Sequence, residues 1–314
     1  MSNTLIRTLS GIAFVIVIVG CLLLGMSTYC VLFALITALL LNEFNELLAR
    51  HDIAQVNNTV SIISGVYLFI AFFLTCSGSA GLVAFAPYIL SLLFILISNL
   101  YSGEELSQKD SPPKLGGVRQ SREGVCSWAY TFAGQLYIAL PMALLNVLAF
   151  NQIYSPILPL AVFVFLWLND TGAYCFGCTL GKKLKWQINI PSPFRGMRGG
   201  LSITHKLFPS ISPKKTWVGS IGGAIVVLLG AWAFHALLPL EGDERGSVFF
   251  WLGLGLTVCV FGTWGDLVES QFKRTLGIKD SGSFLPGHGG ALDRFDSALL
   301  AIPAATAYVL LWGI

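Results

Sequence analysis

Long apolar runs, separated by shorter polar stretches, recur along the whole chain. A helix that crosses a bilayer needs about 20 mostly apolar residues. By this measure the pattern predicts nine membrane spans, at about residues 6–25, 29–48, 59–76, 80–100, 130–150, 154–172, 216–238, 247–266 and 296–313. The second span is the weakest, because Glu43 and Glu46 lie in its tail. We expect that helix to emerge at the membrane interface there.

The composition agrees with this pattern. Of the 314 residues, 55% are hydrophobic and only 11% are charged, and the mean hydropathy is +0.74. Soluble domains carry about 25% charged residues, so an ordinary soluble fold is excluded. We therefore predict an all-α polytopic membrane protein with a single integral membrane domain over residues 1–314. Residues 1–130 would supply the N-terminal spans, and residues 131–314 would carry the polar motifs.

The basic residues predict the orientation of the chain. With nine spans, alternate loops fall on one side of the membrane, and that side collects 18 of the 19 Lys and Arg residues. Only Arg245 lies on the other side. Because cytoplasmic loops are enriched in Lys and Arg, we expect the N-terminus and the three large polar loops, 101–129, 173–215 and 267–295, in the cytoplasm.

Charged residues and glycines gather between residues 261 and 296. Asp266, Glu269, Ser270 and Lys273 have helical spacing, which places them on one face of a helix that leaves the membrane. Gly277 can end that helix. The loop that follows is rich in glycine, and Asp293 and Asp296 then begin the last span, one helical turn apart.

These residues predict a phosphate-transfer site. The carboxylates of Asp266, Asp293 and Asp296 suit Mg²⁺, which binds oxygen ligands, water and substrate phosphates. Cationic side chains and flexible glycine backbone beside them suit a polyphosphate; the cations are Lys273, Arg274, Lys279, His288 and Arg294. The alternative is a salt-bridged loop that only caps the helix bundle.

The same stretch resembles the signature of the phosphatidate cytidylyltransferases, the CDP-diacylglycerol synthases. The resemblance rests on Ser270-Gln-Phe-Lys-Arg, Lys279-Asp280, Leu285-Pro-Gly-His-Gly-Gly and Asp293-Arg-Phe-Asp296. Two upstream stretches are also similar to the family: Asn169-Asp-Thr-Gly-Ala-Tyr with Gly177, and Ser212-Pro-Lys-Lys-Thr-Trp with Gly219. The first 130 residues are similar only in being hydrophobic.

The resemblance implies a Mg²⁺-dependent reaction of CTP with phosphatidic acid that gives CDP-diacylglycerol and pyrophosphate. Asp266, Asp293 and Asp296 would hold the metal, with a second cation such as K⁺ as an addition. Lys273, Arg274 and His288 would complete the catalytic set. Asp170, expected at a helix end, would add a carboxylate or orient a lysine. The remaining substrate-binding residues would be Ser212, Lys214, Lys215, Lys279, Asp280, Gly289, Gly290 and Arg294.

Two departures from the family keep alternatives open. Val218 stands where the family commonly has Glu, and the segment 185–209, with Arg195, Arg198 and His205, is longer than usual. A transferase that acts on another lipid phosphate or uses another nucleotide is one alternative, and a transporter is a second. We expect a cell membrane location, the inner membrane of a bacterium, with membrane lipids but no nucleic acid as partners. The oligomeric state stays open, with a homodimer as one alternative.

Overall fold

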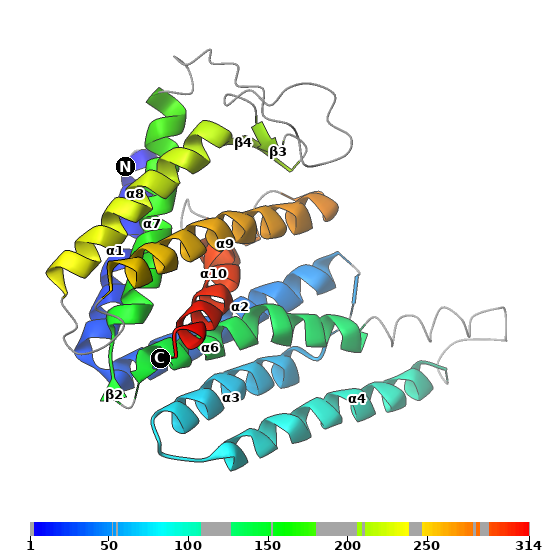
Figure 1. Cartoon of the computed structure of the whole chain (residues 1–314). Coiled ribbons are helices and arrows are strands. Elements are labelled where there is room, and N and C mark those ends of the chain that lie inside the picture. Colours follow the sequence, from blue (N-terminus) through cyan, green and yellow to red (C-terminus); the bar gives the residue numbers. More distant parts are fainter. Residues whose placement is uncertain are drawn as a thin grey trace. The chain divides into compact units, whose positions relative to one another are not determined.

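The described part of the chain is almost entirely helical. Figure 1 shows the computed structural model, which describes residues 3–51, 53–54, 56–107, 127–151, 153–179, 206–208, 211–238, 247–278, 281–282 and 289–313. The strands within these ranges form two short hairpins. One pairs β1 (Phe150–Asn151) with β2 (Ile153–Tyr154), and the other pairs β3 (Lys206–Phe208) with β4 (Ser212–Thr216). The prediction of an all-α fold is confirmed.

Seven helices among the described residues are long and apolar enough to cross a membrane. They are α2 (Met26–Arg50), α3 (Asn58–Cys76), the helix Ser127–Ala149, α7 (Ile157–Thr179), α8 (Trp217–Leu237), α9 (Val248–Thr275) and α10 (Leu292–Leu311). The helix Ser127–Ala149 contains the π-helical turn η2 (Gln135–Ala139) and α6 (Leu140–Ala149). The chain is therefore an integral membrane protein.

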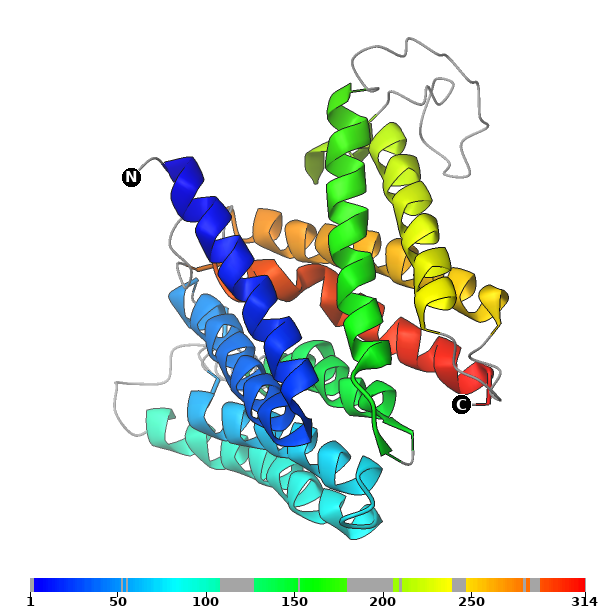
Figure 2. The ribbon, with the colours of Figure 1, turned by 90° about the vertical axis from the view of Figure 1, so that its left-hand side faces the viewer.

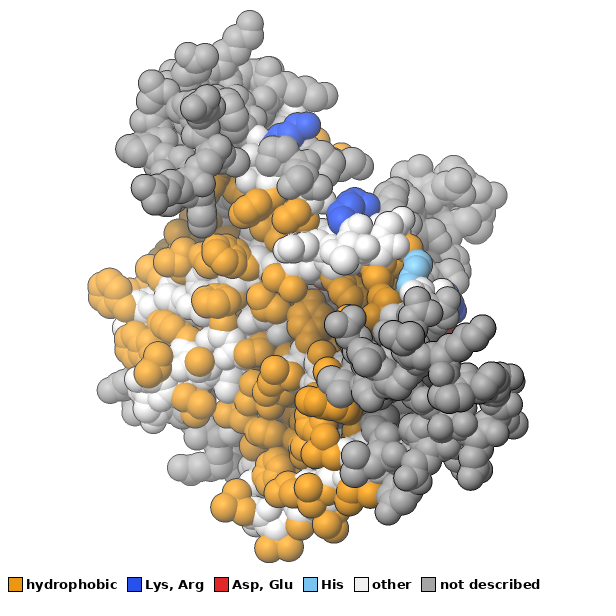
Figure 3. Space-filling model, turned by 90° about the vertical axis from the view of Figure 1, so that its right-hand side faces the viewer, with side chains coloured by type: hydrophobic (Ala, Val, Ile, Leu, Met, Phe, Trp, Pro, Cys, Tyr) orange, Lys and Arg blue, Asp and Glu red, His pale blue; other side chains and the backbone are white. Residues whose placement is uncertain are grey.

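Two further helices have shorter apolar stretches. These stretches are Leu9–Leu24, within α1 (Asn3–Leu24), and Leu82–Ser98, formed by η1 (Leu82–Phe85) and most of α4 (Ala86–Ser107). The predicted count of nine spans is therefore not confirmed. Large apolar side chains such as Leu136, Leu229 and Trp232 are exposed, and Figure 3 shows hydrophobic side chains spread over the face that it draws. Lipid chains would cover such a surface.

The sequence predicted the end of one helix correctly and the end of another wrongly. Helix α9 ends at Thr275, and Gly277 follows with a φ of 70°. This left-handed residue ends the helix as predicted. Helix α7, in contrast, continues to Thr179. The prediction that Asp170 lies at a helix end is therefore wrong, because Asp170 lies inside α7.

The chain divides into two compact units. The first contains residues 1–159 and 280–295, and the second contains residues 160–279 and 296–314. In the first unit α2 and α6 pack on α3. Two buried polar side chains pair between these helices: the Tyr29 hydroxyl donates to Asn146 Oδ1, and Asn146 Nδ2 donates to the carbonyl of Phe69. Such pairing matters in a bilayer, because water is absent from its core. The single-domain interpretation stays a prediction.

In the second unit α7 and α8 approach each other through glycines. Gly219 and Gly223 form a G-x-x-x-G pattern, which lets membrane helices pack closely. A Cβ on Gly223 would lie 2.5 Å from Asn169 Oδ1, and one on Gly172 would lie 3.0 Å from the Cα of Gly223. Figure 2 shows α7 and α8 side by side. The β3–β4 hairpin leads into α8, whose first turn is capped by Thr216: its Oγ1 accepts from the Gly219 amide at 3.2 Å.

Candidate active site

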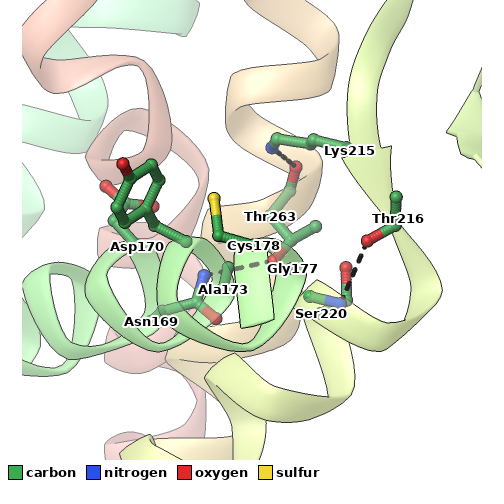
Figure 4. Close-up of a pocket in the computed structure, with 11 residues that line it drawn as sticks. Asn169, Asp170, Ala173, Gly177, Cys178, Lys215, Thr216, Ser220 and Thr263 are labelled. Carbon is green, nitrogen blue, oxygen red and sulfur yellow. Dashed lines mark hydrogen bonds between the residues drawn. The ribbon is translucent and has the colours of Figure 1, made fainter. Parts of the chain in front are cut away.

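A pocket of about 460 Å³ lies in the second unit where α7, α8 and α9 meet (Figure 4). Both upstream stretches that carry the family resemblance line it, and α9 adds one residue. The lining residues are Asn169, Asp170, Ala173, Tyr174, Gly177, Cys178, Lys215, Thr216, Gly219, Ser220 and Thr263. The fold therefore brings together two stretches that lie about 40 residues apart in the sequence.

Asn169 fixes one wall of this pocket. Its side chain is buried, its Nδ2 donates to Thr263 Oγ1 at 3.2 Å, and its Oδ1 accepts from the Cys259 thiol at 3.2 Å. These bonds tie α7 to α9 at the level of Asp170. The sequence analysis quoted the stretch but assigned Asn169 no role, because a polar residue at the end of an apolar run gives no sign of burial.

Lys215 and Asp266 meet at the pocket. Lys215 Nζ lies 2.6 Å from Asp266 Oδ2 and donates to the carbonyl of Thr263 at 3.3 Å. The other carboxylate oxygen of Asp266 accepts from Ser270 Oγ at 3.1 Å. Both side chains of the ion pair are partly exposed, 25% for Lys215 and 29% for Asp266. The cation that lines the pocket is thus paired with a carboxylate, although the sequence assigned the two residues separate roles.

A second ion pair lies deeper on α9. Lys273 Nζ is 2.5 Å from Glu269 Oε2, and the Glu269 side chain has no exposed surface. Asp296 of α10 lies within electrostatic range of Glu269, Asp266 and Asp170. The second unit therefore concentrates carboxylates that repel one another unless cations lie among them.

Arg274 is exposed, and its side chain donates hydrogen bonds to two backbone carbonyls. Its Nη1 donates to the carbonyl of Ile278 at 3.2 Å, and its Nε lies 3.5 Å from the carbonyl of Ile211. It thereby links the end of α9 to the turn before β4. Its role in phosphate binding stays a prediction.

The carboxylates suit Mg²⁺ by their chemistry, because hard oxygen ligands are what this ion prefers. Within the described ranges no group of three or more His, Cys, Asp or Glu side chains is arranged to hold a metal ion. Mg²⁺ commonly uses only one or two carboxylates, together with water and substrate phosphates. Asp266 and Asp296 of the second unit fit that requirement. The inclusion of Asp293 stays a prediction, since that residue belongs to the first unit.

In the first unit Asp293 organises the segment before α10. Its Oδ2 accepts from the amides of Ser281 and Gly290, each at 2.9 Å. Gly289 has a φ of 81°, and a Cβ there would lie 2.5 Å from Asp293 Oδ2. Gly289 and Gly290 therefore have a structural reason for being glycines, in addition to the predicted one of approaching a substrate.

The structure gives the element or the exposure of the other predicted site residues that it describes. Ser212 and Lys214 belong to β4, and Arg294 is exposed in the first turn of α10. Val218 is buried in α8, so the position where the family commonly has Glu packs as an apolar residue here. Lys279, Asp280 and His288 lie outside the described residues, as do Arg195, Arg198 and His205.

Comparison with known proteins identifies the family. The profile of the "Cytidylyltransferase family" matches residues 5–202 and 194–312, which together cover nearly the whole chain. The chain belongs to the cytidylyltransferase family. The pocket and the Lys215–Asp266 ion pair are thus features of a cytidylyltransferase-family member, and both upstream stretches lie within the matched residues.

Several curated relatives of the chain are named phosphatidate cytidylyltransferase. Phosphatidate cytidylyltransferase of Staphylococcus aureus (strain COL) is 43% identical over 144 residues, which is 46% of this chain and 45% of that protein. The proteins of the same name from Staphylococcus haemolyticus and Staphylococcus epidermidis are 41% and 40% identical over 144 residues. The match spans less than half of the length of these relatives.

Proposed function

We propose that this protein transfers the cytidylyl group of CTP to phosphatidic acid and so forms CDP-diacylglycerol and pyrophosphate. The observation that carries the proposal is the Lys215–Asp266 ion pair, partly exposed at a pocket lined by both upstream stretches. The family supports cytidylyl transfer, and the relatives named phosphatidate cytidylyltransferase support the lipid substrate.

The reaction needs charge neutralisation more than a strong base. A phosphate oxygen of phosphatidic acid would attack the α-phosphorus of CTP, forming a P–O bond while the bond to the β-phosphate breaks and pyrophosphate leaves. The lipid phosphate is already anionic at neutral pH, so the barrier is the approach of two anions. Lys215 would donate to the phosphates through charge-assisted hydrogen bonds, which are about twice as strong as neutral ones.

A magnesium ion would share this task. We propose Asp266 and Asp296 as its protein ligands, with Asp293 as the further candidate one turn before Asp296. Bound there, Mg²⁺ would supply positive charge that neutralises the triphosphate. Lys273, already paired with Glu269, would keep the surrounding carboxylates from repelling one another.

The lipid substrate sets where the site must face. We propose that the active site opens to the cytoplasm of a bacterial cell, where CTP is dissolved, while the lipid reaches it from the bilayer. Three positions outside the described residues test this orientation. Cys126 and a cysteine at position 185 (Lys185→Cys) should react with an impermeant thiol reagent only from the cytoplasmic side, and Gly242→Cys only from the outside. Labelling of Gly242→Cys from the cytoplasm contradicts the orientation.

Label transfer tests the activity directly. Purified protein with Mg²⁺, phosphatidic acid and CTP labelled in its α-phosphate should place the label in the lipid extract. Competition by unlabelled ATP, GTP or UTP separates a cytidylyltransferase from an enzyme that uses another nucleotide. Other lipid phosphates in place of phosphatidic acid identify a different acceptor. The absence of label from every lipid tested would overturn the proposal.

Replacing Lys215 by Ala should weaken substrate binding. The variant loses the cation at the pocket, so we expect the apparent KM for CTP to rise on the order of 10-fold, the usual cost of a lost charged hydrogen bond. Lys206→Ala is the matched control, because Lys206 is exposed on the neighbouring strand β3. Unchanged rates of Lys215→Ala at low concentrations of both substrates would mean that Lys215 pairs with Asp266 without binding substrate.

A further inference from the structure

A carboxylate from α2 holds the segment that precedes α10. This loop segment covers residues 281–291, of which the structure describes 281–282 and 289–291. Glu43 Oε2 accepts from the Ala291 amide at 2.6 Å, and Glu43 Oε1 accepts from the Ser281 hydroxyl. All three residues belong to the first unit. Glu43 therefore ties both ends of the loop segment to a helix more than 200 residues away in the sequence.

Glu43 is connected to Asp293 through the same hydroxyl. Ser281 Oγ lies 3.0 Å from Asp293 Oδ2, and Ser281 is only 2% exposed. A hydroxyl carries one proton, so it donates to one of the two carboxylates at a time. The position of Asp293 is thus coupled to that of Glu43 by the buried Ser281 hydroxyl.

The glycines of the loop segment leave room for this carboxylate. A Cβ on Gly290 would lie 1.7 Å from Glu43 Oε1 and 2.3 Å from Ser281 Oγ, and one on Gly282 would lie 3.1 Å from Glu43 Cδ. Any side chain at Gly290 would displace Glu43 or Ser281. The fit between the carboxylate and two glycines indicates that Glu43 belongs to the structure of the loop segment.

We propose that Glu43 is a positioning residue for the transfer reaction. It holds the two described ends of the loop segment, residues 281–282 and 289–291, in place beside Asp293, and it acts on the substrates only through Gly289, Gly290 and Asp293. The inference rests on the proposed function, in which Asp293 is a candidate metal ligand, and on the prediction from the sequence that Gly289 and Gly290 bind substrate. The expectation that this helix emerges at the membrane interface near Glu43 and Glu46 stays a prediction; the structure adds that the Glu43 side chain is half-buried and contacts Ser281 and Ala291.

Two substitutions separate positioning from charge. Glu43→Gln can keep both links, because its amide oxygen can accept from Ala291 and its NH₂ group can donate to Ser281, whose proton then goes to Asp293. Glu43→Met keeps the length of the side chain and removes both links. We expect kcat to fall on the order of 10-fold or more in Glu43→Met, as for buried donors left without partners, and to stay within about threefold of wild type in Glu43→Gln.

Glu46→Gln is the matched control. Glu46 lies three residues along α2 and borders the same small pocket of about 200 Å³. Its hydrogen bonds go to Asn42 and Arg50 of its own helix. It should therefore have wild-type turnover. If Glu43→Gln loses as much turnover as Glu43→Met, the charge of Glu43 itself takes part in the reaction, and the positioning role is overturned.

Hydrogen exchange measures the loop segment without reference to activity. In Glu43→Met the peptide that contains Gly290 and Ala291 should exchange on the order of 10-fold faster than in wild type, because the Ala291 amide loses its acceptor. Glu46→Gln should leave this peptide unchanged. If the peptide exchanges at the wild-type rate in Glu43→Met and the wild-type protein transfers the cytidylyl group, the positioning role is overturned and the proposed function stands. If the peptide exchanges faster in Glu43→Met but the wild-type protein shows no cytidylyl transfer, the anchoring by Glu43 is supported and the proposed function is overturned.

Discussion

Replacing Asp266 by Asn is expected to lower turnover about 100-fold or more, the usual cost of removing an essential electrostatic group from an active site. The change keeps the size of the side chain but removes its charge. It leaves Lys215 Nζ without the carboxylate that lies 2.6 Å away. If Asp266 also holds Mg²⁺, the Mg²⁺ concentration for half-maximal activity should rise in Asp266→Asn and stay unchanged in Lys215→Ala.

A double variant distinguishes catalysis from a merely structural ion pair. Removing one partner of a charge pair leaves the other uncompensated, and removing both relieves that cost. Asp266→Asn combined with Lys215→Met should therefore melt closer to wild type than Asp266→Asn alone. Its turnover should stay low, because the groups that contact substrate are gone. Recovery of turnover together with the melting temperature would show that the pair serves stability alone.

The helices were predictable from the sequence because a bilayer demands long apolar runs. The end of α7 was not, since the polar stretch that begins at Asn169 reads as the end of a span. That stretch stays helical because Asn169 bonds to Thr263 and the glycines of α8 make room for it. The G-x-x-x-G pattern at Gly219 and Gly223 was a readable signal for this close packing.

The residues of the site could be predicted from the sequence, but the side chains that pair with each other could not. Lys215 and Asp266 were both named, yet only the fold shows that they form one ion pair. Glu43 was noted, with Glu46, only as an acid in the tail of a span, because acids near the end of an apolar run give no sign of their partners. The partner of Glu43, the segment before α10, lies at the other end of the chain, and contacts of that range leave no local pattern.

Gly223→Ala should damage both stability and the pocket. The new methyl group would lie 2.5 Å from Asn169 Oδ1 and 2.8 Å from the Asn169 carbonyl oxygen. A backbone carbonyl cannot move without its helix, so α7 and α8 must separate or Asn169 must give up its bonds to Thr263 and Cys259. Overpacking of this kind costs about 1–3 kcal/mol. We also expect kcat/KM for CTP to fall on the order of 10-fold, since about 1.4 kcal/mol of lost transition-state binding corresponds to that factor.

Gly230→Ala is the matched control on the same two helices. A Cβ there would lie 2.4 Å from Leu168 Cδ1, the end of a flexible side chain, and the next atoms are 3.9 Å and 4.0 Å away. Leu168 can rotate, and Ala is a better helix former than Gly by about 1 kcal/mol. Gly230→Ala should therefore melt at or above the wild-type temperature in detergent and keep its KM for CTP. Equal melting temperatures and equal KM values for the two variants would mean that Asn169 and the glycine crossing do not shape the pocket.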